Sequence, residues 1–311
     1  MTKSIYENPD LIADLEKENI QIGVLGSSYL LYGIRTGFFT AKAYNFAANS
    51  QDLYYSRKMY EKFGSRLPLR YIVVGVSRYA FGFDVSKNER RMIFQYSNLG
   101  ISPRDSSAEK WEAGKKRTSA HSRPAQPFNL SYFLQRHLEK SMLYRNRTVF
   151  LIRLYTRLFP ASTPSQKSEN ASPKPQHFPL QMLRMKLKPV TAAGHAQKHL
   201  SAFDQNLRPY AKHDLDALID QALSQGIRVL IVSPPMREDY QSALTAELKD
   251  SFQVDIKDVL SVYRDNPSVR FLDLFSDKRF LPEDFGDPDH LNPQGAEKLT
   301  KILNAEIEKT R

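Results

Sequence analysis

Four apolar runs rich in β-branched residues, each next to a helix-like segment, constrain the fold more than any other feature of this sequence. They are IQIGVLG (20–26), RYIVVGVS (70–77), GIRVLIVSPP (226–235) and SVRFLDLF (268–275). Near-continuous apolar runs of this length are typical of strands covered on both faces, as in a parallel sheet. A weaker run, AKAYNFA (41–47), would add a fifth strand, second in chain order.

Helix-like segments lie between these runs, at 50–64, 212–226 and 292–310. The middle segment is predicted to have an acidic first turn, and Gly226 stands just past its end, as in a helix with a glycine C-cap. This alternation predicts an α/β protein, a doubly wound, three-layer α/β/α sheet of about five parallel strands.

The stretch from 84 to 210 interrupts the alternation. It contains a polar, basic segment (102–126), an amphipathic basic segment (141–159) and a Pro/Ser-rich segment (160–176) typical of a flexible linker. We interpret it as an insertion between strands three and four. The predicted organisation is an N-terminal part of the α/β domain at 1–83, a basic, partly helical insertion at 84–210 and a C-terminal part of the α/β domain at 211–311.

Gly26, Ser27 and Ser28 follow the first predicted strand, at the sheet edge where ligands bind in open parallel sheets. Glycine permits a tight turn, and a serine at this point lies near backbone N–H groups that can stabilise an oxyanion. Taken alone, Gly-Ser-Ser after a strand is more often a turn or a helix cap. A serine nucleophile also needs a base.

A candidate base stands in DFGDPDHLNPQG, just before the last predicted helix. Asp287 precedes His290 by three residues, so the chain can fold its carboxylate back onto Nδ1 and leave Nε2 free to take a serine proton. Asp289 is a rival for this orienting role, but in an extended stretch its side chain should point away from the ring. Asn292 suits the N-cap of the helix that begins near Pro293.

Together, VLGSS and DPDH resemble the SGNH, or GDSL-like, hydrolase superfamily over about 20–80 and 210–308. The resemblance implies a flavodoxin-like SGNH-type sheet, with Ser28 as nucleophile, His290 as base and Asp287 as its orienter; Ser27 replaces the usual Asp of the family. More narrowly, YNFAANSQDLYYS, GVSRYAF and GIRVLIVSPPMREDY look like bacterial proteins of cell-envelope polysaccharide O-acylation.

The resemblance also implies an oxyanion hole, in which this chain departs from the family. The expected donors are the Ser28 backbone N–H, a glycine after the second strand and an asparagine after the third. Here the glycine position falls at Ser50 or its neighbour Asn49, and the asparagine position falls near Ser77. Serine is a shorter donor than asparagine, and the loss of one side-chain donor costs about 3 kcal/mol of transition-state stabilisation.

Two functions therefore stay open. The first is a serine-dependent esterase or O-acyltransferase, most simply O-acetyl, that acts on a bacterial glycan or glycolipid through an acyl-serine and requires no metal or organic cofactor. The second is a catalytically weak or inactive SGNH-like protein that binds a glycan or a partner in envelope polysaccharide assembly. The substitutions at the oxyanion positions are the feature that keeps the second reading open.

The composition and net charge limit the chemistry and the binding partners that this chain can have. The chain has no cysteine, which excludes disulfides, thiolate catalysis and cysteine-ligated metal centres, and its net charge of +11 favours an anionic neighbour. That neighbour could be an anionic membrane surface or an anionic polysaccharide; nucleic acid has only the net charge in its favour. No window suits a membrane-spanning helix and the N-terminus is acidic, so we expect a cytoplasmic chain as the sequence stands, with a peripheral position at the membrane, or an anchor or signal outside this sequence, as the alternatives.

Two further motifs carry less weight. His195 and His199 stand at i and i+4, as in a helical metal pair, but the sequence lacks the glutamate of HExxH and an obvious third ligand. EAGKKRTS imitates the end of a phosphate-binding loop, but Glu109 holds the earlier glycine position and Lys116 replaces the Ser/Thr.

Overall fold

The computed structural model describes residues 5–6, 10–104 and 191–309, and its sheet has five parallel strands. In chain order the strands are β1 Ile22–Leu25, β2 Ala43–Asn45, β3 Tyr71–Gly75, β4 Arg228–Ser233 and β5 Val269–Asp273. They pair in the order β2-β1-β3-β4-β5, the flavodoxin-like arrangement. All five predicted strands are confirmed, and so is the predicted fold class.

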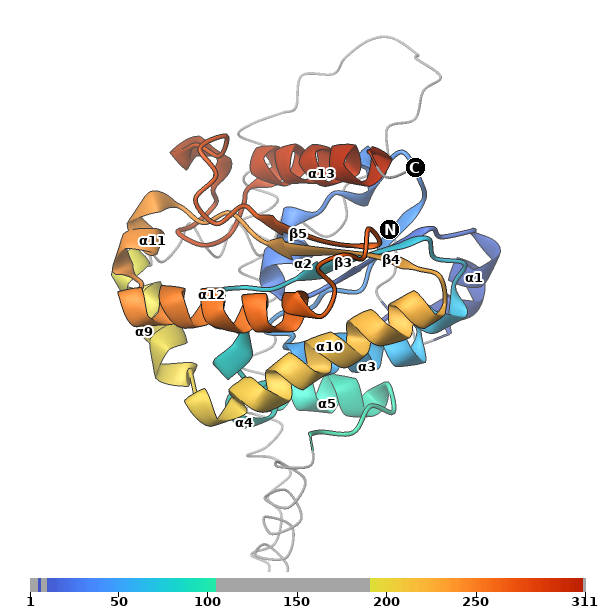
Figure 1. Cartoon of the computed structure of the whole chain (residues 1–311), viewed down its shortest axis with the longest axis horizontal. Coiled ribbons are helices and arrows are strands. Elements are labelled where there is room, and N and C mark those ends of the chain that lie inside the picture. The colour runs from blue at the N-terminus through green and yellow to red at the C-terminus, as the bar shows by residue number, and fades with distance from the viewer. Residues whose placement is uncertain (1–4, 7–9, 105–190, 310–311) are drawn as a thin grey trace, which may run out of the picture. The chain divides into compact units, whose positions relative to one another are not determined.

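Helices cover both faces of the sheet, as Figure 1 shows, with α13 on one side and α3, α10 and α12 on the other. The helices are α1 Leu11–Lys17, α2 Ser28–Gly33, α3 Leu53–Lys62, α4 Val85–Asn88, α5 Arg90–Asn98, α9 Ala192–Ala202, α10 Arg208–Ser224, α11 Glu238–Ala243, α12 Ala246–Ser261 and α13 Pro293–Glu308. The three layers follow from strands that must bury both faces.

The apolar strands supply two cores because successive side chains point to opposite faces. Ile72 and Val74 of β3 belong to the core shared with α3, α10 and α12, whereas Val73 belongs to the core shared with α2 and α13. In the register of the central pair, Val73 lies opposite Val24 of β1. These cores hold the carboxyl ends of the strands, and the loops that follow them, in fixed relative positions.

The helix ends confirm two of the predicted signals and correct a third. Asn292 accepts hydrogen bonds from the backbone N–H groups of Gln294 and Gly295, so it caps α13, and Gly226 adopts φ +73° after α10. However, α10 has no acidic first turn. It begins at Arg208, with Pro209 in its first turn, because a short 3-10 turn leads directly into the helix and extends it ahead of the predicted start.

Both ends of the predicted insertion pack against the sheet domain. The Tyr96 ring of α5 stacks on Tyr55 of α3 at 3.9 Å between centroids, and α9 contacts α11. The basic segments at 102–126 and 141–159 and the linker at 160–176 lie wholly or mostly outside the described residues. Among the described residues, no helix is both long and apolar enough to cross a membrane.

Candidate active site

Ser28 stands at the first turn of α2, where β1 ends. Gly26 makes this turn with φ +139°, and a Cβ there would lie 3.2 Å from the backbone of Gly75 at the end of β3. Only glycine meets both requirements. Ser27 is the N-cap of α2, but its side chain makes no capping hydrogen bond. Ser28 is half-buried at this turn.

The loop after β5 curls around the Asp287 side chain. Asp287 Oδ1 accepts hydrogen bonds from the backbone N–H groups of Asp289 (3.0 Å) and His290 (2.7 Å). The Gly286 N–H donates to the His290 carbonyl at 2.9 Å and closes the loop. This Asx-type turn brings the Asp287 carboxylate to 3.0 Å from His290 Nδ1, and the residue spacing alone suggested that contact.

The two sequence signals meet at the carboxyl edge of the sheet. His290 Nε2 lies 2.8 Å from Ser28 Oγ, across 262 residues of chain. Two rings of α2 hold the imidazole: Tyr29 stacks on it at 5.1 Å and Tyr32 contacts it edge-on at 5.6 Å. Ser28, His290 and Asp287 thus form a continuous hydrogen-bonded chain with the geometry that proton transfer from a serine requires.

Asp289 does not point away from the ring, and the expectation that it would is wrong. Its Oδ1 lies 3.1 Å from His290 Nδ1, so two carboxylates face the same nitrogen. The reason is the loop conformation: the chain from Gly286 to His290 is tightly turned, not extended, and an alternation rule for extended chain does not apply. Asp289 is 1% exposed, more deeply buried than Asp287.

Helix α9 brings two histidines to Asp289. His195 Nδ1 lies 2.6 Å from Asp289 Oδ1, while His199 Nε2 lies 3.9 Å from Oδ2. His199 also stacks on Tyr79 at 4.4 Å, and its Nδ1 lies 2.6 Å from the Tyr240 hydroxyl. The i, i+4 spacing indicated that the histidines share a helix face, but their carboxylate partner could not be read from the sequence.

This cluster is arranged for hydrogen bonding. His195, Asp287 and Asp289 offer ligand atoms that lie within 4.8 Å of one another, which makes them the candidate metal group among the described residues. Yet His195 Nδ1 and Asp289 Oδ1, 2.6 Å apart, are in direct contact. A zinc ion bound by both atoms at about 2.0–2.2 Å would hold them further apart, so the donor set as arranged does not fit one.

The charges within the cluster shift its pKa values. Burial disfavours the imidazolium form of His290, but the carboxylates of Asp289 and Asp287 outweigh it and raise the pKa of His290 to about 10. Burial likewise disfavours the Asp289 carboxylate, yet His290 and His195 hold the pKa of that group well below its usual range. The hydrogen bond that His195 donates to Asp289 raises the pKa of His195, whereas burial lowers the pKa of His199 to about 4.

The predicted oxyanion residues lie beside this centre. Ser50 has φ +57°, so it keeps the left-handed backbone that glycine favours at this point. Ser50 and Ser77 both line a small cavity of about 10 Å³, room for one water-sized group. The Tyr32 hydroxyl donates to Asn49 Oδ1 at 2.8 Å, which leaves the Asn49 amide N–H groups as donors. Their role as oxyanion donors stays a prediction.

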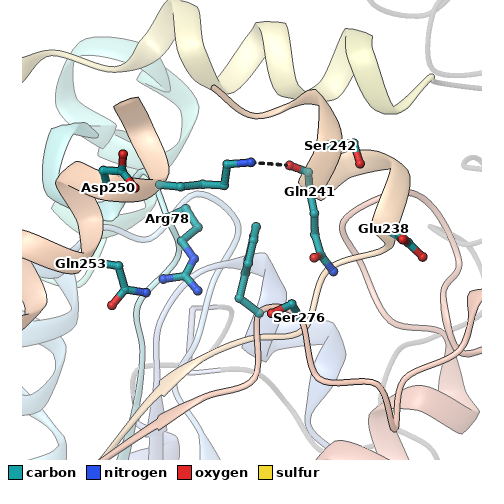
Figure 2. A pocket seen from close by; sticks show the side chains of 9 residues that line it. Arg78, Glu238, Gln241, Ser242, Asp250, Gln253 and Ser276 are labelled. Carbon is teal, nitrogen blue, oxygen red and sulfur yellow. Dashed lines mark hydrogen bonds between the residues drawn. The ribbon is translucent and has the colours of Figure 1, made fainter. Parts of the chain in front are cut away.

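A larger cavity of about 400 Å³ opens at the same edge of the sheet, between α11 and α12 (Figure 2). The Arg78 guanidinium beside it is 6% exposed, lies over the rings of Phe252 and Phe275, and donates to both oxygens of Asp273. The other residues around the cavity are Glu238, Gln241, Ser242, Lys249, Asp250, Gln253, Phe275 and Ser276. Because cations and carboxylates are mixed here, charge does not select the sign of a ligand.

Comparison with solved structures finds several similar chains, two of them from Bacteroides species. A GDSL-like lipase from Bacteroides thetaiotaomicron has a TM-score of 0.46 and 10% identity, over 98% of each chain. A putative acylhydrolase from Bacteroides fragilis has a TM-score of 0.45 and 10% identity, over 99% of each chain. At these values the likenesses carry no functional argument. No family model and no curated protein matches the sequence.

Proposed function

We propose that this protein is a serine-dependent esterase or O-acyltransferase of SGNH type that acts on ester-linked acyl groups of a bacterial glycan or glycolipid. One observation carries the proposal: Ser28 Oγ lies 2.8 Å from His290 Nε2, while Asp287 lies 3.0 Å from Nδ1 of the same ring. A serine hydroxyl is a weak nucleophile until a positioned base takes its proton, and this arrangement supplies such a base.

The reaction proceeds through an acyl-enzyme. Ser28 Oγ attacks the ester carbonyl carbon and His290 Nε2 takes its proton. When the tetrahedral intermediate collapses, the bond to the leaving oxygen breaks and His290 returns the proton to that oxygen. Water or a sugar hydroxyl then attacks acyl-Ser28 with its proton passing to His290, and the Ser28 oxygen recovers a proton as it leaves. Asp287 keeps Nε2 directed at Ser28 throughout.

The oxyanion would be held by backbone N–H groups at Ser28 and Ser50, with Asn49 or Ser77 as the side-chain donor. The glycine-like φ of Ser50 supports its part in this set, and the pairing of Asn49 Oδ1 with Tyr32 supports Asn49 as donor. If the shorter Ser77 hydroxyl takes the place of the Asn49 amide as the side-chain donor, we expect a slower reaction.

Two features support a glycan as the acyl-bearing or acyl-accepting molecule. The cavity in Figure 2 offers amide, hydroxyl, carboxylate and guanidinium groups beside one aromatic ring, Phe275, a mixture that suits a ligand rich in hydroxyls. The net charge of +11 belongs to the whole chain and would attract acidic glycans at long range, without setting the sign of the ligand in this cavity.

Hydrolysis of p-nitrophenyl acetate by wild type, Ser28→Ala and Ser27→Ala tests the proposal. Wild type should release p-nitrophenol, and Ser28→Ala should lose at least about 10³-fold in kcat/KM because the nucleophile is gone. Ser27→Ala is the matched control: this neighbouring serine makes no side-chain capping bond, so its loss should change the rate little. Equal turnover by wild type and Ser28→Ala would refute the esterase proposal and favour the non-catalytic, glycan- or partner-binding reading.

Intact mass measured after incubation with an activated acetyl donor separates hydrolysis from transfer. For a transferase, we expect an acetyl adduct on Ser28 that persists in water and disappears when an acceptor glycan is added. For a hydrolase, the adduct disappears in water alone.

A further inference from the structure

We propose that Asp289 is a positioning residue for His290, and that His195 of α9 sets how strongly Asp289 acts on it. The proposal rests on the proposed function only in taking His290 as the general base. Its physical content is an arrangement of one buried carboxylate between two imidazoles, and that arrangement can be measured whether or not the protein is an enzyme.

Asp289 is buried among donors that leave it few other partners. It is 1% exposed, and no lysine or arginine among the described residues forms an ion pair with it. Its Oδ1 faces His195 Nδ1 at 2.6 Å and His290 Nδ1 at 3.1 Å, and its Oδ2 accepts from the Tyr29 hydroxyl at 3.1 Å. A buried carboxylate is costly unless it is hydrogen-bonded and paired with an opposite charge; here His195 and Tyr29 supply the hydrogen bonds, and His290 faces Oδ1 at ion-pair distance.

The two imidazoles therefore compete for one oxygen. The hydrogen bond with His195 takes up part of the negative charge on Oδ1, so the His195 contact limits the pull of Asp289 on the imidazolium form of His290. Asp287 differs, because its Oδ1 is also occupied by two backbone N–H groups of its own loop. Asp287 thus acts locally, whereas Asp289 connects His290 to α9.

The other groups around Asp289 do not replace its contacts with His195 and His290. His199 on α9 lies 3.9 Å from Oδ2 and has a lowered pKa because it is buried. The hydroxyls of Tyr29, Tyr79 and Tyr240 are buried, and their pKa values are raised. Arg237, at the start of α11, donates to both oxygens of Asp239, so its charge is already paired. The groups facing Asp289 whose pKa values are raised by it are thus the imidazoles of His195 and His290, the latter to about 10.

The arrangement predicts shifts of opposite sign. Asp289→Asn removes the carboxylate that both imidazoles face, so the titration midpoints of His290 and His195 should both fall, for His290 by about one pH unit or more. His195→Phe removes a donor but leaves Asp289 charged, so the midpoint of His290 should rise. His195→Gln restores an N–H donor at that place and should return the midpoint toward the wild-type value.

The test is an NMR titration of the full chain labelled with ¹⁵N-histidine, in wild type and these variants. Lys198→Gln is the matched control, since it removes an exposed cation from the same helix and should leave His290 unchanged. If the midpoint of His290 is the same in Asp289→Asn and wild type, or if Asp289→Asn and His195→Phe shift it in the same direction, the proposal is wrong. Should Asp289→Asn fail to fold, the His195→Phe and His195→Gln pair still decides.

The pH profile of kcat/KM for p-nitrophenyl acetate then links the shifts to catalysis. Its acidic limb should move with the His290 midpoint, to lower pH in Asp289→Asn and to higher pH in His195→Phe. If the NMR shifts occur in a protein that has no esterase activity, the positioning proposal stands and the proposed function fails.

Discussion

His290 and His195 both contact Asp289 Oδ1, but two different regions of the molecule bring them there. The loop after β5 holds His290 through bonds among its own residues, such as Asp287 Oδ1 to the His290 N–H. Helix α9 holds His195 through packing with other elements, in which His199 stacks on Tyr79 and contacts Tyr240. A disturbance of the loop should therefore damage the site itself, whereas a disturbance of α9 should retune it.

The largest expected effect comes from the loop. In Asp287→Asn the side-chain oxygen can still accept the two backbone N–H groups, so the fold should hold, but the imidazole loses the anion that stabilises its charged form. We expect kcat/KM to fall by about 10³-fold, somewhat less than for a triad with a single carboxylate because Asp289 still faces Nδ1. His195→Gln should change kcat/KM only a few-fold. Equal losses in the two variants would remove the distinction between the regions.

The next prediction concerns how kcat/KM of the wild type changes with pH. The pKa of His290 is raised to about 10, and the base must be neutral to accept the Ser28 proton. In buffered steady-state assays, kcat/KM should therefore rise about tenfold per pH unit from near neutrality and level off near pH 10. A plateau that begins near pH 6.5 would show that the two carboxylates do not act on His290 as described.

The same shift has a consequence for stability. A pKa higher in the folded than in the unfolded state contributes stability that is fully present below the unfolded value, about 6.5, and is lost as the pH rises through about 10. The contribution of His290 to the free energy of unfolding should therefore decline over this window. In His290→Gln that part of the decline should vanish, which urea titrations at several pH values would detect.

Alanine substitutions at one glycine near each region compare how closely the backbone there is packed. A Cβ at Gly295 in α13 would overlap the carbonyl oxygen of Asp284, next to the loop, so Gly295→Ala should lower the free energy of unfolding by about 3 kcal/mol. A Cβ at Gly194 in α9 would meet only Thr191 Oγ, at 3.1 Å, and alanine favours the helix, so Gly194→Ala should change it by less than about 1 kcal/mol. Urea unfolding measures both, and a reversed order would contradict the comparison.

A further, modest effect concerns how α9 packs against its neighbours. His199→Phe keeps a ring against Tyr79 but leaves the buried Tyr240 hydroxyl without its imidazole partner, at a cost of about 1–2 kcal/mol. Thermal unfolding should show a lower Tm, while Gln197→Ala, on the exposed face of the same helix, should match wild type. An unchanged Tm for His199→Phe would mean that this contact does not hold α9.

Much of the fold could be predicted because parallel strands need continuous apolar runs. The run at 70–77 became β3, and the weaker run at 41–47 became β2 at the sheet edge. The start of α10 was misplaced because acidic residues within a helix resemble those of a first turn, and the leading 3-10 turn has no comparable pattern.

The contacts of the site also differ in how far the sequence predicts them. The approach of Asp287 to His290 follows from three-residue spacing in a Gly/Pro loop, and the meeting of Ser28 with His290 follows from sheet topology. The Asp289 contact depends on the turned conformation of the loop, which spacing does not reveal. The His195 contact depends on where α9 packs. From the sequence alone, two histidines at i and i+4 predict a metal site as readily as a hydrogen bond to a carboxylate.

The central claim is that His290 activates Ser28. A fluorophosphonate probe, which reacts with serines made nucleophilic by a base, followed by peptide mapping, tests it most directly. We predict a single label on Ser28, absent in Ser28→Ala, strongly reduced in His290→Gln and retained in Ser27→Ala. A label on Ser27, or equal labelling of wild type and His290→Gln, would contradict the account.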